Sequence, residues 1–219
     1  KGADLLKLFI TPGVPDPFST FVPSFLSLEE ISVAVSEGAR LGIPTAAHCI
    51  GGQGLKDCID GGVDVIEHMY MATEQDVDRL ASSRCVVDLT SGIFLDPSRE
   101  EFLSPANALK VRQNRSRVRE NVARIIKARL PFVLGTDAYH GLLYREVGYA
   151  VELGAAPVTA IQGVTSHAAK VCRLEDRIGK LENGLEADII AVKGNPLEDV
   201  SRLSQVGLVM KGGVIYRQP

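Results

Sequence analysis

Two histidines in this chain each end a short apolar run: His48 closes the run from Pro44, and His68 closes the run from Val63. The Gly-punctuated stretch between them, around Leu55 to Asp60, has the pattern of the helix in a strand-helix-strand crossover. The carboxyl ends of parallel strands meet at one edge of a sheet, so we expect both imidazoles to face one pocket. Imidazole is the commonest metal-binding side chain, and the pair therefore predicts a metal site. The alternative is two strand-end histidines that are each hydrogen-bonded to a neighbouring loop.

Two further residues stand inside or just after apolar runs. Lys7 lies within the run from residue 5 to 10, and Asp137 follows the run that begins at Pro131. Burying an ammonium is costly unless the group is used; the alternative is an edge-strand lysine that reaches water. Nitrogen ligands with a carboxylate suit zinc or a similar divalent ion, and Asp137 could also accept a proton from a metal-bound water. A neutral lysine amine can add carbon dioxide, and the resulting carbamate behaves as a bridging carboxylate.

The elements that would position these residues alternate along the chain. We expect an α/β protein with about five strand-helix units of roughly 35 residues and a buried parallel sheet. Ser27 and Glu30 fit a capping box that opens a helix, and the loop 11–26 is expected to cover the mouth of a pocket. The expected strands are 5–10, 44–48, 63–68, 85–90 and 131–137; the expected helices are 28–41, 55–60, 73–83, one within 105–129, 143–153 and 157–170, and 91–105 is expected to be a loop.

The last part of the chain has a different composition. From about Glu175, glycines separate short β-rich runs, among them the predicted strand 187–192. Two runs, 206–210 and 214–216, flank Lys211-Gly212-Gly213, which predicts a hairpin turn. We therefore predict two domains, a catalytic α/β domain at 1–174 and a small β segment at 175–219.

Bulk properties narrow the classes of function. The net charge is −3 and both signs are dispersed, which does not favour nucleic-acid binding. No apolar run reaches the roughly 20 residues that span a bilayer. The four cysteines show no CxxC spacing, which is typical of free thiols in the cytoplasm. We expect a cytoplasmic protein with a small-molecule or dipeptide substrate, no nucleic-acid or membrane partner, and properties compatible with a homo-oligomer.

In its ordered motifs the chain resembles the amidohydrolase superfamily, in particular imidazolonepropionase-like and Xaa-Pro-dipeptidase-like enzymes. The resemblance implies a metal-dependent hydrolase of C–N bonds with a (β/α)8 barrel and a small β-sandwich. It also implies that Lys7 is carboxylated and bridges two metals, that His48 and His68 bind one metal, and that Asp137 binds the other and is the catalytic acid/base. The motifs are Gly2-Ala-Asp-Leu-Leu-Lys7, Ala46-Ala-His48, Ile66-Glu-His68, Gly135-Thr-Asp-Ala138, Thr165-Ser166, Gly184-Leu-Glu-Ala-Asp-Ile-Ile190 and Gly194-Asn-Pro-Leu197.

The chain departs from that family in two respects. The family's first strand carries a His-x-His pair, whereas the histidines here are His48, His68, His140 and His167. A full barrel takes about 250 residues, and residues 1–174 suffice for about five units. The chain is therefore expected to be the carboxyl-terminal portion of such an enzyme, a partial (β/α)8 TIM-type barrel with the C-terminal part of the sandwich. These residues could hold one ion well; zinc is preferred, and manganese, iron or cobalt are alternatives.

The loop after Asp137 supplies candidates for substrate binding. His140, Tyr139 and Tyr144 are the first of these, with a plain loop hydrogen bond as the alternative. Arg145, Thr90 and Ser91 are weaker candidates of the same kind, and His167 is expected to be structural. The alternative to the hydrolase is a non-catalytic truncated barrel, which acts as a fragment or as a binding or structural module.

Overall fold

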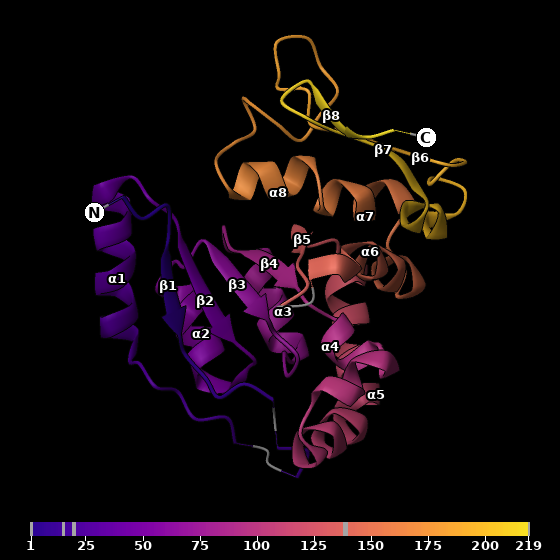
Figure 1. The fold of residues 1–219 in the computed structure, drawn as a ribbon. Helices are drawn as coiled ribbons and strands as arrows, with labels where there is room; N and C mark the ends of the chain where they lie inside the picture. The colour runs from indigo at the N-terminus through magenta and orange to yellow at the C-terminus, as the bar shows by residue number, and fades with distance from the viewer. Residues whose placement is uncertain (1, 15, 19–20, 138–139, 219) are drawn as a thin grey trace. The chain divides into compact units, whose positions relative to one another are not determined.

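The computed structural model of the chain describes residues 2–14, 16–18, 21–137 and 140–218, without the side chain of His140. It divides into two compact units, 1–132 and 133–219. A five-stranded sheet with the order β1-β2-β3-β4-β5 confirms the predicted α/β class, and its first four strands pair in parallel (Figure 1). The strands are β1 Leu6–Phe9, β2 Thr45–Cys49, β3 Val65–His68, β4 Val86–Leu89 and β5 Phe132–Leu134.

The register of the sheet separates its side chains into two faces. Phe9 pairs with His48, His48 with Glu67, and Glu67 with Asp88, so these four residues form one row across the sheet. Neighbours in register point to the same side, and Lys7, two residues before Phe9, points there too. The opposite face carries the apolar residues Leu8, Ala47, Ile66 and Val87, the last three almost fully buried. The charged side chains of the sheet therefore lie on one face.

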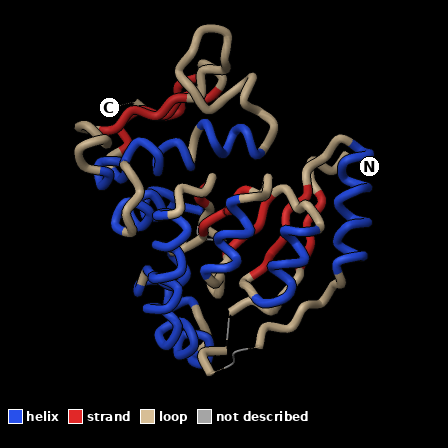
Figure 2. Tube along the Cα trace, turned by 180° about the vertical axis from the view of Figure 1, so that it is seen from behind, coloured by secondary structure: helices blue, strands red, loops and turns tan. Residues whose placement is uncertain are grey.

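Helices cover the apolar face of this sheet. They are α1 Leu28–Leu41, α2 Gly52–Asp60 and α3 Glu74–Ala81. Both views place α1 beside the edge strand β1 (Figures 1 and 2). A Cβ on Gly38 of α1 would lie 3.0 Å from Thr45 Cγ2, and one on Gly54 of α2 would lie 2.7 Å from Ile10 Cγ2. Only a residue without a side chain allows these helices to approach the strands so closely.

The capping box predicted at the start of α1 is present. Glu30 N donates to Ser27 Oγ at 3.3 Å, and Ser27 N donates to Glu30 Oε2 at 2.8 Å. Ser27→Ala leaves the first of these N–H groups without its partner, so we expect a loss of about 1 kcal/mol in the free energy of unfolding. Urea denaturation measures it. The control is Ser32→Ala in the same helix, where the hydroxyl only back-bonds to Leu28 O; a loss as large as that of Ser27→Ala would contradict a capping role.

The segment between β4 and β5 contains more structure than the sequence indicates. Where we expected a loop from 91 to 105, the chain forms α4 Gly92–Leu95 and the 3-10 helix η1 Pro97–Phe102. Asp96 Oδ1 caps η1 by accepting from Ser98 N, and Ser104 caps the long helix α5 Pro105–Lys127. Arg115 of α5 donates to Phe94 O at 2.6 Å and so fixes α4 against α5. This last contact joins residues 21 positions apart, which local periodicity does not reveal.

The second unit begins within β5 and continues through helices. They are the 3-10 helix η2 His140–Leu142, α6 Leu143–Glu152, α7 Pro157–Gly163 and α8 Ser166–Val171. The prediction of one helix from 157 to 170 was wrong, because the chain leaves the helical conformation at Thr165 (φ −130°, ψ −99°). A Cβ on Gly179 would lie 3.1 Å from Thr165 O and 2.7 Å from the Ala169 side chain. The following segment thus packs directly on the break.

A small antiparallel sheet follows, in the order β6-β7-β8. Its strands are β6 Ile189–Val192, β7 Val206–Lys211 and β8 Val214–Arg217, with the 3-10 helix η3 Val200–Ser204 between β6 and β7. The hairpin predicted at Lys211-Gly212-Gly213 is present. Both glycines have positive φ (55° and 80°), which suits a two-residue turn between antiparallel strands. The predicted domain boundary at 174/175 stays a prediction. Across the described part of the chain, no helix has the length and apolarity to cross a membrane.

Candidate metal centre

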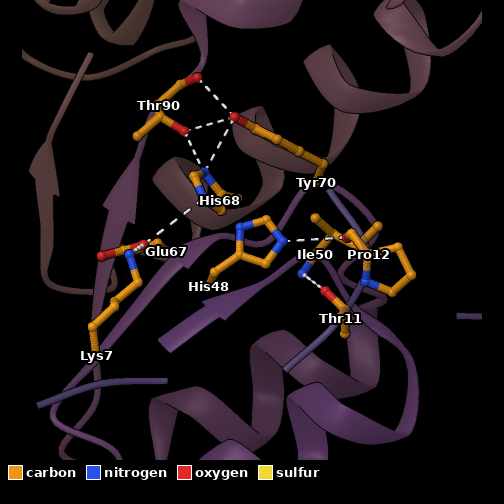
Figure 3. A network of polar contacts seen from close by, with 9 residues as sticks. All are labelled: Lys7, Thr11, Pro12, His48, Ile50, Glu67, His68, Tyr70 and Thr90. Carbon is orange, nitrogen blue, oxygen red and sulfur yellow. Dashed lines mark hydrogen bonds and ion pairs between the residues drawn. The ribbon is translucent and has the colours of Figure 1, made fainter. Parts of the chain in front are cut away.

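The two strand-end histidines lie side by side at the carboxyl edge of the sheet. His48 stands near the end of β2 and His68 ends β3. Their ring centroids are 4.6 Å apart at an interplanar angle of 65°, an edge-on arrangement (Figure 3). Both are buried. The structure therefore brings together the two imidazoles that the sequence singles out.

The position of the His68 ring depends on a local change of backbone conformation. In a regular strand, the residue after Glu67 would point to the face opposite that of Glu67 and His48. His68 has a φ of 78° and Met69 a φ of 53°, so the chain turns into the left-handed region just where β3 ends. This conformation costs roughly 1–2 kcal/mol for a residue other than glycine. The turn places the ring beside His48.

Each imidazole is held through one of its two nitrogens. His48 Nε2 lies 3.2 Å from the carbonyl oxygen of Pro12, and His68 Nδ1 lies 2.7 Å from Thr90 Oγ1. A carbonyl only accepts, so Nε2 of neutral His48 carries the proton and Nδ1 keeps its lone pair. Fixing one ring nitrogen in this way is how proteins orient a histidine that binds a metal through the other nitrogen.

The protonation of His68 also suits a ligand. Burial, followed by the nearby charges of His48 and Lys7, lowers the pKa of His68 to about 3. Its imidazole is therefore neutral at ordinary pH. A metal ligand must be neutral imidazole, because protonation removes the lone pair that binds the ion.

Lys7 reaches the same place but is not buried. Its side chain is 47% exposed, which agrees with the alternative of an edge-strand lysine that reaches water, because β1 is an edge strand of the sheet. Lys7 Nζ is 2.5 Å from Glu67 Oε2, and the same oxygen is 3.8 Å from His68 Nε2 (Figure 3). The Glu67 carboxylate thus lies between the lysine amine and the second imidazole.

The aromatic residue Phe9 covers one face of the His48 ring. The Phe9 ring stacks on the His48 ring with centroids 4.1 Å apart and an interplanar angle of 6°, and Phe25 stacks on Phe9 at 6.2 Å. This wall keeps the first imidazole in the orientation that its bond to Pro12 sets.

The loop after β1, residues 11–26, borders a cavity, as we predicted. A cavity of about 290 Å³ lies between this loop and the residues that follow the two histidines, Ile50 and Met71. Its walls are mainly apolar, with Asp16 and Lys110 as the charged members. The cavity is next to the centre because Pro12 both lines it and contacts His48.

The other predicted residues belong to the second unit, and part of them lies outside the description. Asp137 belongs to the second unit, follows β5, is exposed and has a φ of 45°. Tyr139 lies outside the described residues, and of His140 the structure describes the backbone, which begins η2. The membership of Asp137, Tyr139 and His140 in the site stays a prediction.

Three residues of the cluster were missed or given another role by sequence reasoning. Glu67 was quoted only as part of a motif, although its register beside His48 follows from aligning two strand ends. Tyr70 lacks any such signal. Thr90 was a weak candidate for touching substrate; its hydroxyl instead contacts His68.

The donor chemistry fits a divalent cation in part. His48 and His68 offer two imidazoles, each with one nitrogen bonded to a protein partner and the other turned away from it, and Glu67 and Lys7 stand beside them. Within residues 2–14, 16–18, 21–137 and 140–218, no three His, Cys, Asp or Glu side chains have the geometry of a complete metal site. The chain therefore shows two nitrogen donors of a site whose other donors are still to be assigned.

Comparison with known proteins agrees with this architecture. Ochratoxinase of Aspergillus niger is 31% identical over 234 residues, which cover 100% of this chain and 47% of that protein. Imidazolonepropionase of Hahella chejuensis is 28% identical over 188 residues, 80% of this chain and 42% of that protein. A Xaa-Pro dipeptidase crystallised with methionine in its active site superposes with a TM-score of 0.86 at 33% identity, over 99% of this chain and 55% of the other.

The chain spans about half the length of these relatives. Its five-stranded parallel sheet with helices is thus part of a TIM-barrel-like fold, with a small antiparallel sheet added, as the sequence predicts. Residues 21–216 match the amidohydrolase family. Because this match takes in the strands that carry His48 and His68 as well as the β-rich tail, the chain belongs to the amidohydrolase family.

Proposed function

We propose that this chain is the metal-binding portion of a hydrolase that cleaves C–N bonds in small amides, cyclic amides or dipeptides. The observation that carries the proposal is the edge-on pair of imidazoles at the ends of two adjacent parallel strands. The substrate class is supported by the relatives named above, a Xaa-Pro dipeptidase and an imidazolonepropionase.

His48 and His68 would hold one divalent ion, with zinc as the first choice for imidazole ligands. When bound, such an ion supplies an activated water and polarises the scissile carbonyl. Lys7 has two states in this proposal. As an ammonium it pairs with Glu67, as in the structure. As a carbamate, formed from the neutral amine and carbon dioxide with release of a proton, it would add a negative charge beside Glu67, which requires the positive charge of metal ions.

Asp137 is the proposed acid/base. A carboxylate at that place would take the proton from the attacking water and give it to the departing nitrogen. Tyr139 and His140 are proposed to contact the substrate, because in barrel enzymes the loops after the strands line the active site.

Assay of the purified chain tests this function. Metal-free protein is compared with protein supplied with Zn²⁺, against a panel of Xaa-Pro and other dipeptides and of lactams, with the released amine measured. We expect hydrolysis that depends on the metal, and a fall of about 10²–10⁴-fold in kcat for Asp137→Asn. Asp176→Asn, at an exposed acid of the second unit, is the matched control. Turnover that survives in Asp137→Asn at the wild-type rate would refute the assigned acid/base.

A second candidate is a non-catalytic binding or structural module. One observation favours it: within the described residues, β1 forms an edge of the parallel sheet and no strand pairs with its outer side. Such edges favour association with another strand. Tight zinc binding without hydrolysis of any member of the panel would support this candidate over the hydrolase.

A further inference from the structure

Two hydroxyl groups stand behind His68, on the side away from Glu67. Thr90 follows β4, and its Oγ1 is 2.7 Å from His68 Nδ1. Tyr70 lies two residues after His68, and its Oη is 2.6 Å from Thr90 Oγ1, 2.9 Å from Thr90 O and 3.4 Å from His68 Nδ1 (Figure 3). All three side chains are buried. Hydrogen bonds link the two hydroxyls with the His68 ring, so the protons in these contacts can be assigned.

The Thr90 carbonyl oxygen determines where the hydroxyl proton of Tyr70 points. A carbonyl oxygen has no proton, so the single hydroxyl proton of Tyr70 is donated to it. In the 2.6 Å contact between the two hydroxyls, Thr90 Oγ1 must then donate and Tyr70 Oη accept. The proton of Thr90 is used in that bond. In the 2.7 Å contact with His68, Thr90 Oγ1 therefore accepts, and His68 Nδ1 carries the proton.

These hydrogen bonds define which nitrogen of the His68 ring carries the proton. A neutral histidine has one N–H, so a proton on Nδ1 leaves the lone pair on Nε2, the nitrogen that faces Glu67 at 3.8 Å. His48 is the opposite case, with the proton on Nε2 and the lone pair on Nδ1. A carbonyl alone fixes His48. A hydroxyl can donate or accept, so the contact with Thr90 alone would leave the tautomer of His68 undecided. The hydrogen bonds of Tyr70 make the Thr90 hydroxyl the acceptor in its contact with His68.

We propose that Thr90 and Tyr70 are positioning residues that hold His68 in its Nδ1–H tautomer and so keep Nε2 available for the cation. The inference rests on the proposed function for its purpose, since it assigns the two hydroxyls to the metal centre. It does not rest on that function for its evidence, because the tautomer is a property of the metal-free chain.

The first measurement is the tautomer itself. Protein labelled with ¹⁵N-histidine and free of metal is studied at neutral pH by long-range ¹H–¹⁵N correlation, which distinguishes protonated from unprotonated ring nitrogens. Single His→Gln variants assign the four rings. We expect His68 as the Nδ1–H form and His48 as the Nε2–H form. Thr90→Ser should keep the His68 pattern, whereas Thr90→Val and Tyr70→Phe should lose it. An Nε2–H form of His68 in the wild type would overturn the proposal.

The second measurement is the affinity for Zn²⁺, by competition with a chromophoric chelator. Removing an outer partner of a ligating histidine typically weakens metal binding by about 10–100-fold. We expect that loss for Thr90→Val and Tyr70→Phe, and wild-type affinity for Thr90→Ser. The controls are Thr165→Val, where the hydroxyl donates to Ile161 O at the end of α7 in the second unit, and Tyr216→Phe on the exposed strand β8. Wild-type affinity in both Thr90→Val and Tyr70→Phe would refute a positioning role.

The two measurements separate this inference from the function on which it draws. If the predicted tautomers are found and are lost in Thr90→Val, but the wild type binds no zinc, the proton count is supported and the hydrolase proposal is contradicted. If zinc binds and supports hydrolysis while His68 has the other tautomer, the function stands and the role of Thr90 and Tyr70 is refuted. Thr90→Val and Tyr70→Phe preserve side-chain shape, and circular dichroism verifies that each variant is folded.

Discussion

His68→Ala is expected to reduce the affinity of the chain for Zn²⁺ by more than about 100-fold. The reason is that His68 provides one of only two imidazoles found together among the described residues, and losing a ligand costs more than losing an outer partner of one, which is worth about 10–100-fold. Chelator competition on metal-free protein measures the effect. His48→Ala should behave in the same way, since both rings are assigned to the same ion.

The control for this experiment is His167→Ala. His167 lies in α8 of the second unit, so its replacement removes an imidazole from the chain and leaves both histidines of the pair in place. Equal losses of affinity in His167→Ala and His68→Ala would show that zinc binds elsewhere. Unchanged affinity in His68→Ala would show that the ring is not a ligand.

Phe94→Ala is expected to lower the free energy of unfolding by about 3–5 kcal/mol, the usual cost of removing a fully buried aromatic ring. Phe94 is 0% exposed in α4, and its ring packs edge-on against Tyr70 with centroids 4.6 Å apart. The cavity left behind would lie directly behind the hydroxyls that contact His68. Urea denaturation followed by circular dichroism measures the loss.

Phe102→Ala is the matched control, because that ring is 69% exposed at the end of η1. A change within about 0.5 kcal/mol is expected there. If Phe94→Ala destabilised the protein no more than Phe102→Ala, the packing of α4 beneath the centre would not be the support that the structure indicates.

The sequence predicts the strands and the two imidazoles well because the signal is local. An apolar run that ends in histidine places that side chain at the carboxyl end of a strand, and two such runs in succession place both at one edge. The capping box at Ser27 and the Gly212-Gly213 turn follow from equally local rules. In each case the residues that decide the structure lie within a few positions of one another.

The features that the sequence does not predict depend on contacts between residues far apart in the chain. Thr90 and Tyr70 are 20 positions apart, and their proton order depends on the left-handed turn at His68, which no propensity assigns to a histidine. The sequence left open whether Lys7 is buried or reaches water, because its exposure is decided by whether another strand pairs with the outer edge of β1. The break at Thr165 similarly depends on Gly179, which packs on it from the following segment.

The most direct test of a shared cation is anomalous diffraction at the zinc edge from crystals of the zinc-loaded chain. We predict one zinc peak between the two rings, with Zn–N distances of about 2.0–2.1 Å to His48 Nδ1 and His68 Nε2. Pro12 O and Thr90 Oγ1 should keep their contacts with the opposite nitrogens. A zinc peak away from both rings, or one bonded to His48 through Nε2 with the Pro12 contact broken, would contradict the account.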